Sequence, residues 1–101
     1  EVDEFRLDAA RPAADLARVV RAGNPRPGAW FTVDGKRVKV LRAHETADHR
    51  TLAPGELAPD GALGTASEVL ILDEVQPQGK RAMDARAWRA GARDRARVDP
   101  P

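Results

Sequence analysis

Asn24-Pro25-Arg26-Pro27-Gly28-Ala29-Trp30-Phe31 is one of two stretches that decide the fold of this chain, and Gln76-Pro77-Gln78-Gly79-Lys80-Arg81-Ala82-Met83 is the other. Each combines proline, which fixes φ near about −65°, with glycine, which accepts positive φ. Such a bend stops the preceding element and redirects the chain. We expect the first bend to open a strand and the second to lead toward a short helix.

The segment after the first bend predicts a β-hairpin. Residues Ala29–Val33 are rich in aromatic and β-branched side chains, which favour strands. Asp34-Gly35 then supplies the two positive φ values of a type I′ turn. The return strand, Lys36–Ala43, alternates between apolar and basic side chains. Its inward set is expected to be Val38 and Val40, and its outward set Arg37, Lys39 and Leu41.

The rest of the chain predicts short strands between two helices. Pro12 suits the first turn of a helix that ends at Gly23. Glu68–Gln76 is the strongest strand, and its apolar run indicates a central position. Weaker elements complete the chain: short strands at Gly55–Ala58 and Ala62–Ala66, a final helix at Ala85–Ala90 docked by Trp88, an initial strand or linker at 1–8 and a frayed end at 92–101. This order predicts a mainly β fold, a small open antiparallel barrel with an N-terminal helix and a short C-terminal helix.

Length and composition favour one small domain, residues 1–101. A chain of this size buries roughly 60–70% of its unfolded surface. The absence of cysteine excludes a disulfide framework and thiolate chemistry. No apolar run approaches the about 20 residues of a membrane-spanning helix, and no signal-peptide pattern is present. Because the chain starts at Glu1 rather than Met, we expect it to be part of a longer protein.

The net charge of +1 hides three blocks of opposite charge. Residues 11–42 carry a net charge of +6, residues 43–79 carry −6, and residues 80–97 carry +5. Blocks of this kind create local fields that the total conceals. If the two basic blocks meet on one face, they form a surface for a polyanion; otherwise they are ordinary solvated surface charge.

One segment resembles a zinc-protease motif but fails on spacing. In His44-Glu45-Thr46-Ala47-Asp48-His49 the second histidine lies at i+5 instead of i+4, off the shared face of a helix. A solvated loop over Glu45–Leu52 is the better interpretation, and we expect no metal site.

Two further patterns carry no chemistry. Asp73 and Glu74 are neighbours in a strand and point to opposite faces, so an acid–base pair is not expected. Gly61 and Gly64 lack the Lys-Ser/Thr and the helix start of a phosphate loop. The sequence therefore predicts no catalytic, cofactor-binding or metal-binding residue in this chain.

Several motifs follow one another in a definite order over residues 6–91: a helix, Asn-Pro-x-Pro-Gly, an aromatic strand, an Asp-Gly hairpin, Val-Lys-Val, Pro-Gly, an apolar strand, Gln-Pro-x-Gly-Lys-Arg-x-Met and a short helix. This order is similar to the C-terminal domain of the methionyl-tRNA formyltransferase family. The resemblance implies an open Greek-key barrel related to the OB-fold, attached behind a Rossmann-like catalytic domain. It also implies that the catalytic Asn, His and Asp and the formyl donor 10-formyltetrahydrofolate belong to that other domain, since no position here matches them.

The resemblance implies a role in holding RNA rather than in chemistry. The expected partners are initiator tRNA and the N-terminal catalytic domain, in the cytoplasm. Lysine and arginine neutralise phosphates without reading sequence. The residues expected to contact tRNA are Arg37, Lys39, Arg42, Lys80, Arg81, Arg86 and Arg89. Trp30 and Trp88 could stack on bases, but packing in the core is favoured for large aromatic side chains in a small barrel.

Two other functions fit the same sequence. In a sister formyltransferase that acts on an amino sugar or a peptide-synthetase substrate, the barrel would serve as a packing and partner module. A free-standing OB-like interaction module is the other alternative. The sequence upstream of Glu1 separates these possibilities, because a Rossmann-like domain with the catalytic triplet would exclude a free-standing module.

Overall fold

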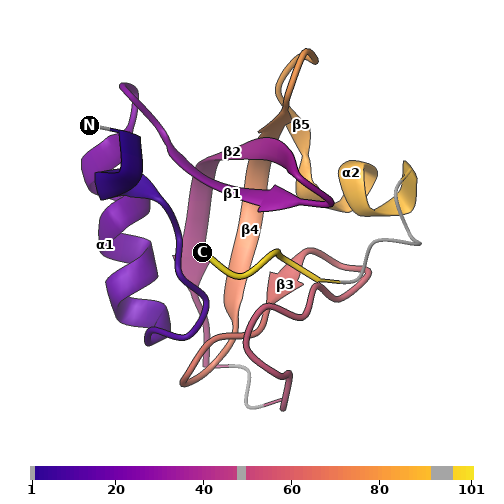
Figure 1. The fold of residues 1–101 in the computed structure, drawn as a ribbon. Helices are drawn as coiled ribbons and strands as arrows, with labels where there is room; N and C mark the ends of the chain where they lie inside the picture. The colour runs from indigo at the N-terminus through magenta and orange to yellow at the C-terminus, as the bar shows by residue number, and fades with distance from the viewer. Residues whose placement is uncertain (1, 48–49, 92–96) are drawn as a thin grey trace.

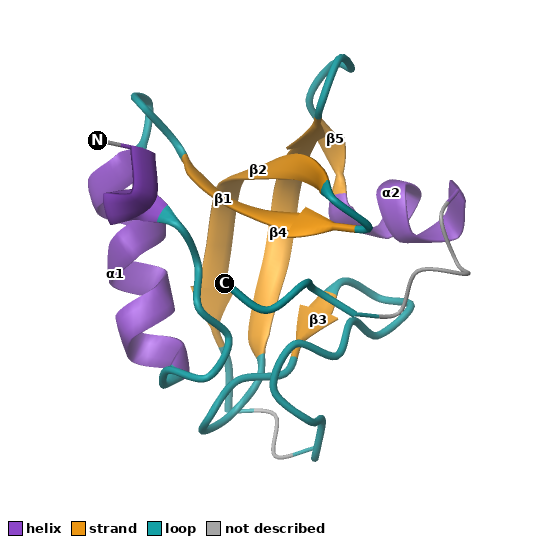
Figure 2. Cartoon of the chain, in the orientation of Figure 1, coloured by secondary structure: helices purple, strands orange, loops and turns teal. Residues whose placement is uncertain are grey.

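An antiparallel sheet lies at the centre of the molecule, with one helix on each side of it (Figures 1 and 2). The computed structural model describes residues 2–47, 50–91 and 97–101. In chain order its elements are a 3-10 turn η1 (Val2–Phe5), helix α1 (Ala13–Gly23), strands β1 (Ala29–Val33), β2 (Lys36–Glu45), β3 (Ala62–Leu63), β4 (Leu70–Pro77) and β5 (Met83–Asp84), and helix α2 (Ala85–Gly91). In this described part of the chain, no helix is long and apolar enough to cross a membrane.

The sheet is built on the long pairing of β2 with β4. Its strand order is β1-β2-β4-β3, and β5 joins the same edge of β4 as β3 does. The register of β2 on β4 shifts between Val40 and Ala43, an irregularity of the kind that bends and twists a strand. The sheet therefore curls into a half-barrel, which confirms the mainly β, open-barrel fold class with a helix near each end.

The predicted hairpin is confirmed in detail. Strand β1 has the expected bounds, and β2 extends two residues beyond the expected end at Ala43. Asp34 and Gly35 both have positive φ, 53° and 78°. The weaker strands are shorter than expected: β3 has two residues, and the segment expected at Gly55–Ala58 contributes only isolated bridges at Glu56 and Leu57.

The core fills the concave side of the sheet and joins both helices to it. Helix α1 contributes Leu16 and Val20, which are buried with Phe31 from β1. The Asn24 side-chain amide donates to the carbonyl oxygens of Val20 (2.8 Å) and Val40 (3.1 Å). One side chain from the first bend thus satisfies acceptors on both α1 and β2, and it fixes the helix against the strand.

Trp88 docks α2, as the sequence predicts. Its side chain is buried in the same core, and its ring lies 6.1 Å from that of Phe31, centroid to centroid. This spacing is within the range in which aromatic pairs attract one another.

The two ends of the chain lie against the hairpin. After η1, Arg6 forms a single parallel bridge with Trp30, where a strand or linker was expected. At the other end, residues 92–96 of the expected frayed segment lie outside the described residues. Within the rest of that segment, Val98 is buried in the core, and its N–H donates to the Gly55 carbonyl at 2.7 Å.

Asp99 anchors this C-terminal segment to the hairpin turn. Its carboxylate accepts hydrogen bonds from the Thr32 hydroxyl (2.9 Å) and from the backbone N–H groups of Gly35 (2.8 Å) and Asp34 (3.2 Å). The bond from Gly35, followed by the bond from Thr32, holds the pKa of Asp99 below its usual value. The charged carboxylate is therefore the form that stabilises the folded state.

Replacing Gly64 by Ala should destabilise the protein severely. A Cβ at this position would overlap the Ala53 carbonyl oxygen and lie 2.9 Å from Leu52 Cβ, so backbone would have to move. We expect the free energy of unfolding, measured by urea denaturation, to fall by roughly 1–3 kcal/mol or more. Gly91→Ala is the matched control, because nothing lies within 4 Å of a Cβ there. Equal stabilities of the two variants would contradict the close approach.

Replacing Asp99 by Asn should reduce stability in a pH-dependent manner. Because the folded-state pKa is lowered, the carboxylate contributes its full stabilisation above the unfolded-state pKa of about 3.9 and loses it as the pH falls through the folded-state pKa. We expect Asp99→Asn to be less stable than the parent at pH 7, with a difference that narrows below about pH 4. Urea denaturation between pH 7 and pH 3 measures this, with Glu68→Gln as an exposed-carboxylate control. A difference that stays constant over this range would refute the role of the charge.

Candidate nucleic-acid interface

The convex face of the hairpin carries two of the cations that the sequence predicts to contact RNA. Thr32 on β1 is paired with Arg37 on β2, and Trp30 is paired with Lys39. Partners across an antiparallel ladder share a face, so these four side chains lie on one surface. Val38 and Val40 are buried on the opposite face, as the alternation predicts. Lys39 is exposed and Arg37 is half-buried.

Trp30 is buried beneath two arginines and does not belong to the apolar core. Its exposed fraction is 5%, yet it lies outside the core cluster that contains Phe31. The guanidinium carbon of Arg37 lies 3.9 Å from the ring centroid, and that of Arg6 lies 4.9 Å away. Contacts of this kind are worth roughly 0.5–1 kcal/mol when exposed and about 2 kcal/mol when desolvated. Trp30 therefore restrains the position of the Arg37 guanidinium.

The second sequence bend is fastened directly to Arg37. The Gln78 N–H donates to the Arg37 carbonyl at 2.9 Å, and the Arg37 N–H donates to the side-chain oxygen of Gln78 at 3.1 Å. Within the turn, the Gln76 side chain donates to the Lys80 carbonyl at 3.0 Å. Cations far apart in the sequence, Arg37 and Lys80, are thereby held at the same end of the sheet.

Four cations surround this end of the sheet, and we call Lys36, Arg37, Lys39 and Lys80 the cationic patch. Arg37 and Lys39 line a cavity of about 590 Å³ on the convex side, together with Thr32, Gly35 and residues 76–79. Lys36, Arg37 and Lys80 line a neighbouring cavity on the side of α2. None of the described residues that line the two cavities is acidic. A cavity edged by one sign of charge concentrates the opposite charge, here a polyanion.

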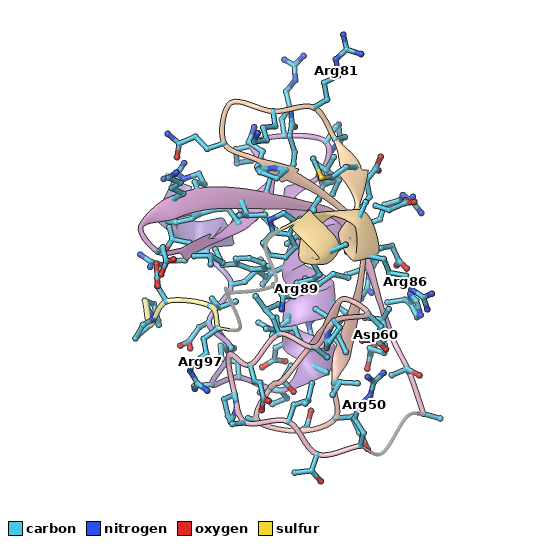
Figure 3. All side chains as sticks on the ribbon, turned by 90° about the vertical axis from the view of Figure 1, so that its right-hand side faces the viewer. Arg50, Asp60, Arg81, Arg86, Arg89 and Arg97 are labelled. Atoms are coloured by element: carbon cyan, nitrogen blue, oxygen red, sulfur yellow. The ribbon has the colours of Figure 1, made fainter. Side chains whose placement is uncertain are left out.

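Three other predicted cations do not line these two cavities. Arg42 forms an ion pair with Glu74 at 3.2 Å, an exposed pair of the kind worth about 0–1 kcal/mol. Arg86 lines a different cavity, which it shares with Asp60 and Arg50. Arg81 follows Lys80 in the chain and points outward at the end of the molecule, as Figure 3 shows. The structure therefore divides the predicted set instead of bringing all of it together.

Arg89 is the buried member of the predicted set. Its side chain is only 3% exposed, and its Nε donates to the Ala58 carbonyl at 3.3 Å. Burial lowers the pKa of its guanidinium. The buried face of α2 is formed by Ala85, Trp88 and Arg89, at the i, i+3, i+4 spacing of a packed helix. Arg86 is consequently exposed to solvent, whereas Arg89 is buried.

The acidic and histidine side chains of β2 and β4 form separate pairs. Strand β2 includes His44 and Glu45, although a solvated loop was expected to begin at Glu45. The Nδ1 atom of His44 lies 2.7 Å from the Asp73 carboxylate. Glu74 pairs with Arg42, so Asp73 and Glu74 do not form an acid pair. His49 lies outside the described residues. Within residues 2–47, 50–91 and 97–101, no group of three His, Cys, Asp or Glu side chains could hold a metal ion.

Two parts of this site were not predicted from the sequence. Lys36 is paired with Val33, so the alternation along the strand would turn its side chain toward the core. It lies at the end of the hairpin, however, and is exposed. The Asp-Gly turn directly before it was the available signal, since a strand end next to a tight turn leaves the core. Arg6 stacks on Trp30 from a segment remote in sequence, and no local pattern indicates that contact.

The family model for the formyl transferase C-terminal domain matches residues 1–93 of this chain. Curated relatives include the methionyl-tRNA formyltransferases of Thermobifida fusca (43% identical over 94 residues), Streptomyces coelicolor (43% over 95 residues) and Mycobacteroides abscessus (42% over 100 residues). These matches cover 90%, 91% and 96% of this chain and 30%, 31% and 32% of the relatives. The chain thus spans about a third of the length of the curated relatives it matches.

A solved structure with the same fold is that of HypX from Aquifex aeolicus in complex with tetrahydrofolic acid. The match has a TM-score of 0.75 at 19% identity and covers the whole of this chain and 19% of the HypX chain. At this level of identity the likeness concerns the fold alone, and it agrees with the curled half-barrel described above. Fold, motif order and family match together show that this chain belongs to the family of formyl transferase C-terminal domains.

Proposed function

We propose that this chain is the tRNA-contacting C-terminal domain of a methionyl-tRNA formyltransferase. Family membership and the names of the curated relatives support the parent activity. The observation that carries the RNA contact is the cationic patch, where lysine and arginine side chains from β2 and from the β4–β5 connection line two adjoining cavities.

The patch would act on the phosphate backbone. Each Lys or Arg that neutralises a phosphate releases condensed counterions, which provides affinity without sequence readout. Arg37 would contribute most, because its planar guanidinium can bind a phosphate through two parallel hydrogen bonds. Its stacking on Trp30 restricts its motion before RNA binds, so less side-chain freedom is lost on binding.

The contribution to formylation would be orientation. The parent enzyme would carry the catalytic residues and bind 10-formyltetrahydrofolate in its N-terminal domain, in the cytoplasm. This domain would hold initiator tRNA so that the methionyl end reaches that catalytic site. Fixing one reactant in a productive geometry lowers the entropic part of the barrier without any bond being made by the domain that holds it.

Affinity for initiator tRNA should fall steeply with salt. If all four cations of the patch contact phosphates, the association constant should decrease on the order of 100-fold between about 50 and 200 mM salt. Replacing Arg37, Lys39 and Lys80 together by Glu should abolish most of the binding, and single Ala variants should each reduce the slope of log K against log salt by about 1. Fluorescence anisotropy with labelled tRNA measures both effects.

A matched charge change elsewhere provides the control. Replacing Arg11, Arg18 and Arg21, which are exposed on and beside α1, by Glu alters the net charge equally. This variant should retain most of the affinity. Flat salt dependence, or equal losses in the two triple variants, would remove the patch from the interface. An affinity for tRNA that does not depend on salt would favour a sister formyltransferase that does not act on tRNA.

Trp30→Leu should weaken tRNA binding through Arg37. Loss of the ring frees the guanidinium that stacks 3.9 Å above it, so we expect a loss of affinity of roughly 2- to 30-fold, the equivalent of the cation–π contact. A double-mutant cycle separates this from a general loss of structure: in the Arg37→Ala background, Trp30→Leu should have little further effect. An undiminished effect in that background would show that Trp30 does not act through Arg37.

A further inference from the structure

A groove adjoins the cationic patch between the hairpin end, the β4–β5 connection and α2. Its volume is about 430 Å³, which lies in the range of small-molecule sites. Four of the apolar side chains that line it are buried or half-buried: Val33, Val38, Met83 and Trp88. The cations that line it are exposed or half-buried: Lys36, Arg37 and Lys80. The groove therefore has an apolar floor and a cationic rim.

This combination fits one chemical class of ligand. An aromatic base that carries a phosphate presents an apolar ring and a dianionic or monoanionic group, and the two would meet the floor and the rim. Unpaired RNA bases are recognised in this manner, by stacking and apolar contact, while their phosphates bind cations. A plain phosphate ligand would leave the floor of Met83 and Trp88 unused.

The groove is continuous with the convex side of the patch. Arg37, Pro77 and Gln78 line both this groove and the 590 Å³ cavity on the convex side of the hairpin. A backbone that follows the cations along the hairpin therefore reaches the groove at Arg37. An RNA strand held at the convex cavity could place its next nucleotide on the apolar floor without leaving the cations.

We propose that this groove binds one unpaired nucleotide of RNA, with the base against Met83 and the part of Trp88 that lines the groove, and with the phosphate between Lys36 and Lys80. The proposal rests on the proposed RNA contact and adds a base-binding site to it. The domain then distinguishes RNA with an accessible unpaired base from a continuous duplex, which could bind the rim alone.

Two small ligands test the base contact directly. AMP and ribose 5-phosphate carry the same phosphate, but only AMP carries a base. In NMR titrations, AMP should shift the indole N–H signal of Trp88, whereas ribose 5-phosphate should leave it unchanged; Trp30→Phe assigns the two indole signals. Equal shifts with both ligands, or a response confined to Trp30, would overturn the proposal.

Filling the groove tests it without changing any charge. Ala87 is exposed and lines the groove, while Ala90 is exposed on the same helix and does not line it. Ala87→Leu should weaken binding of a single-stranded RNA oligonucleotide by roughly ten-fold or more, as loss of one bound base does. Ala90→Leu should bind like the parent, and melting temperatures verify that both variants are folded.

The two proposals fail in different ways. If neither tRNA nor the oligonucleotide binds, the RNA contact itself is wrong. If tRNA binds with the expected salt dependence but Ala87→Leu and Ala90→Leu have equal affinities for the oligonucleotide, only the groove is wrong. The ligand titrations do not depend on either variant, so the proposal stays testable even if Ala87→Leu is unstable.

Discussion

The antiparallel pairing of β2 with β4 is the interaction on which the rest of the molecule depends. It joins the two sequence bends, because β2 follows the first and β4 runs into the second. The core lies on its concave side, where Val40 and Val75 are paired and fully buried. The cations lie at its end, where Lys39 faces Gln76 and Gln78 is hydrogen-bonded to Arg37. A single ladder thus sets both packing and surface charge.

The curl of the sheet separates the two roles of its side chains. The concave side collects the apolar residues of both helices, while the convex side of the hairpin has only Trp30 as a large aromatic. Arginines shield that ring from water, so its burial does not require the apolar core. This arrangement places a rigid platform beneath a charged group, and charged groups held in advance bind anions at a lower entropic cost.

How far the sequence predicts the structure depends on the range of the interactions involved. The hairpin, α1 and the central strand were predictable because turn residues, periodicity and β-propensity act within a few positions. The hydrogen bond from Arg89 to the Ala58 carbonyl was not, since it joins residues 31 positions apart in the sequence. Nor was the packing of the C-terminal segment, where Asp99 binds Thr32 across 67 residues. Both are polar contacts between distant segments, and no periodic pattern records them.

The sequence by itself determined where the chain turns, which side chains of the hairpin face inward and how charge is divided along the chain. These properties follow from backbone sterics and from alternation within a strand. Only the tertiary structure decided which cations lie near one another. Lys36, Arg37 and Lys39 lie at the same end of the sheet as Lys80 because β2 and β4 are aligned in one particular register. Arg42 is paired with Glu74, Arg86 lines another cavity and Arg89 is buried. Register is set by packing of the whole core, and the order of charges along the sequence does not specify it.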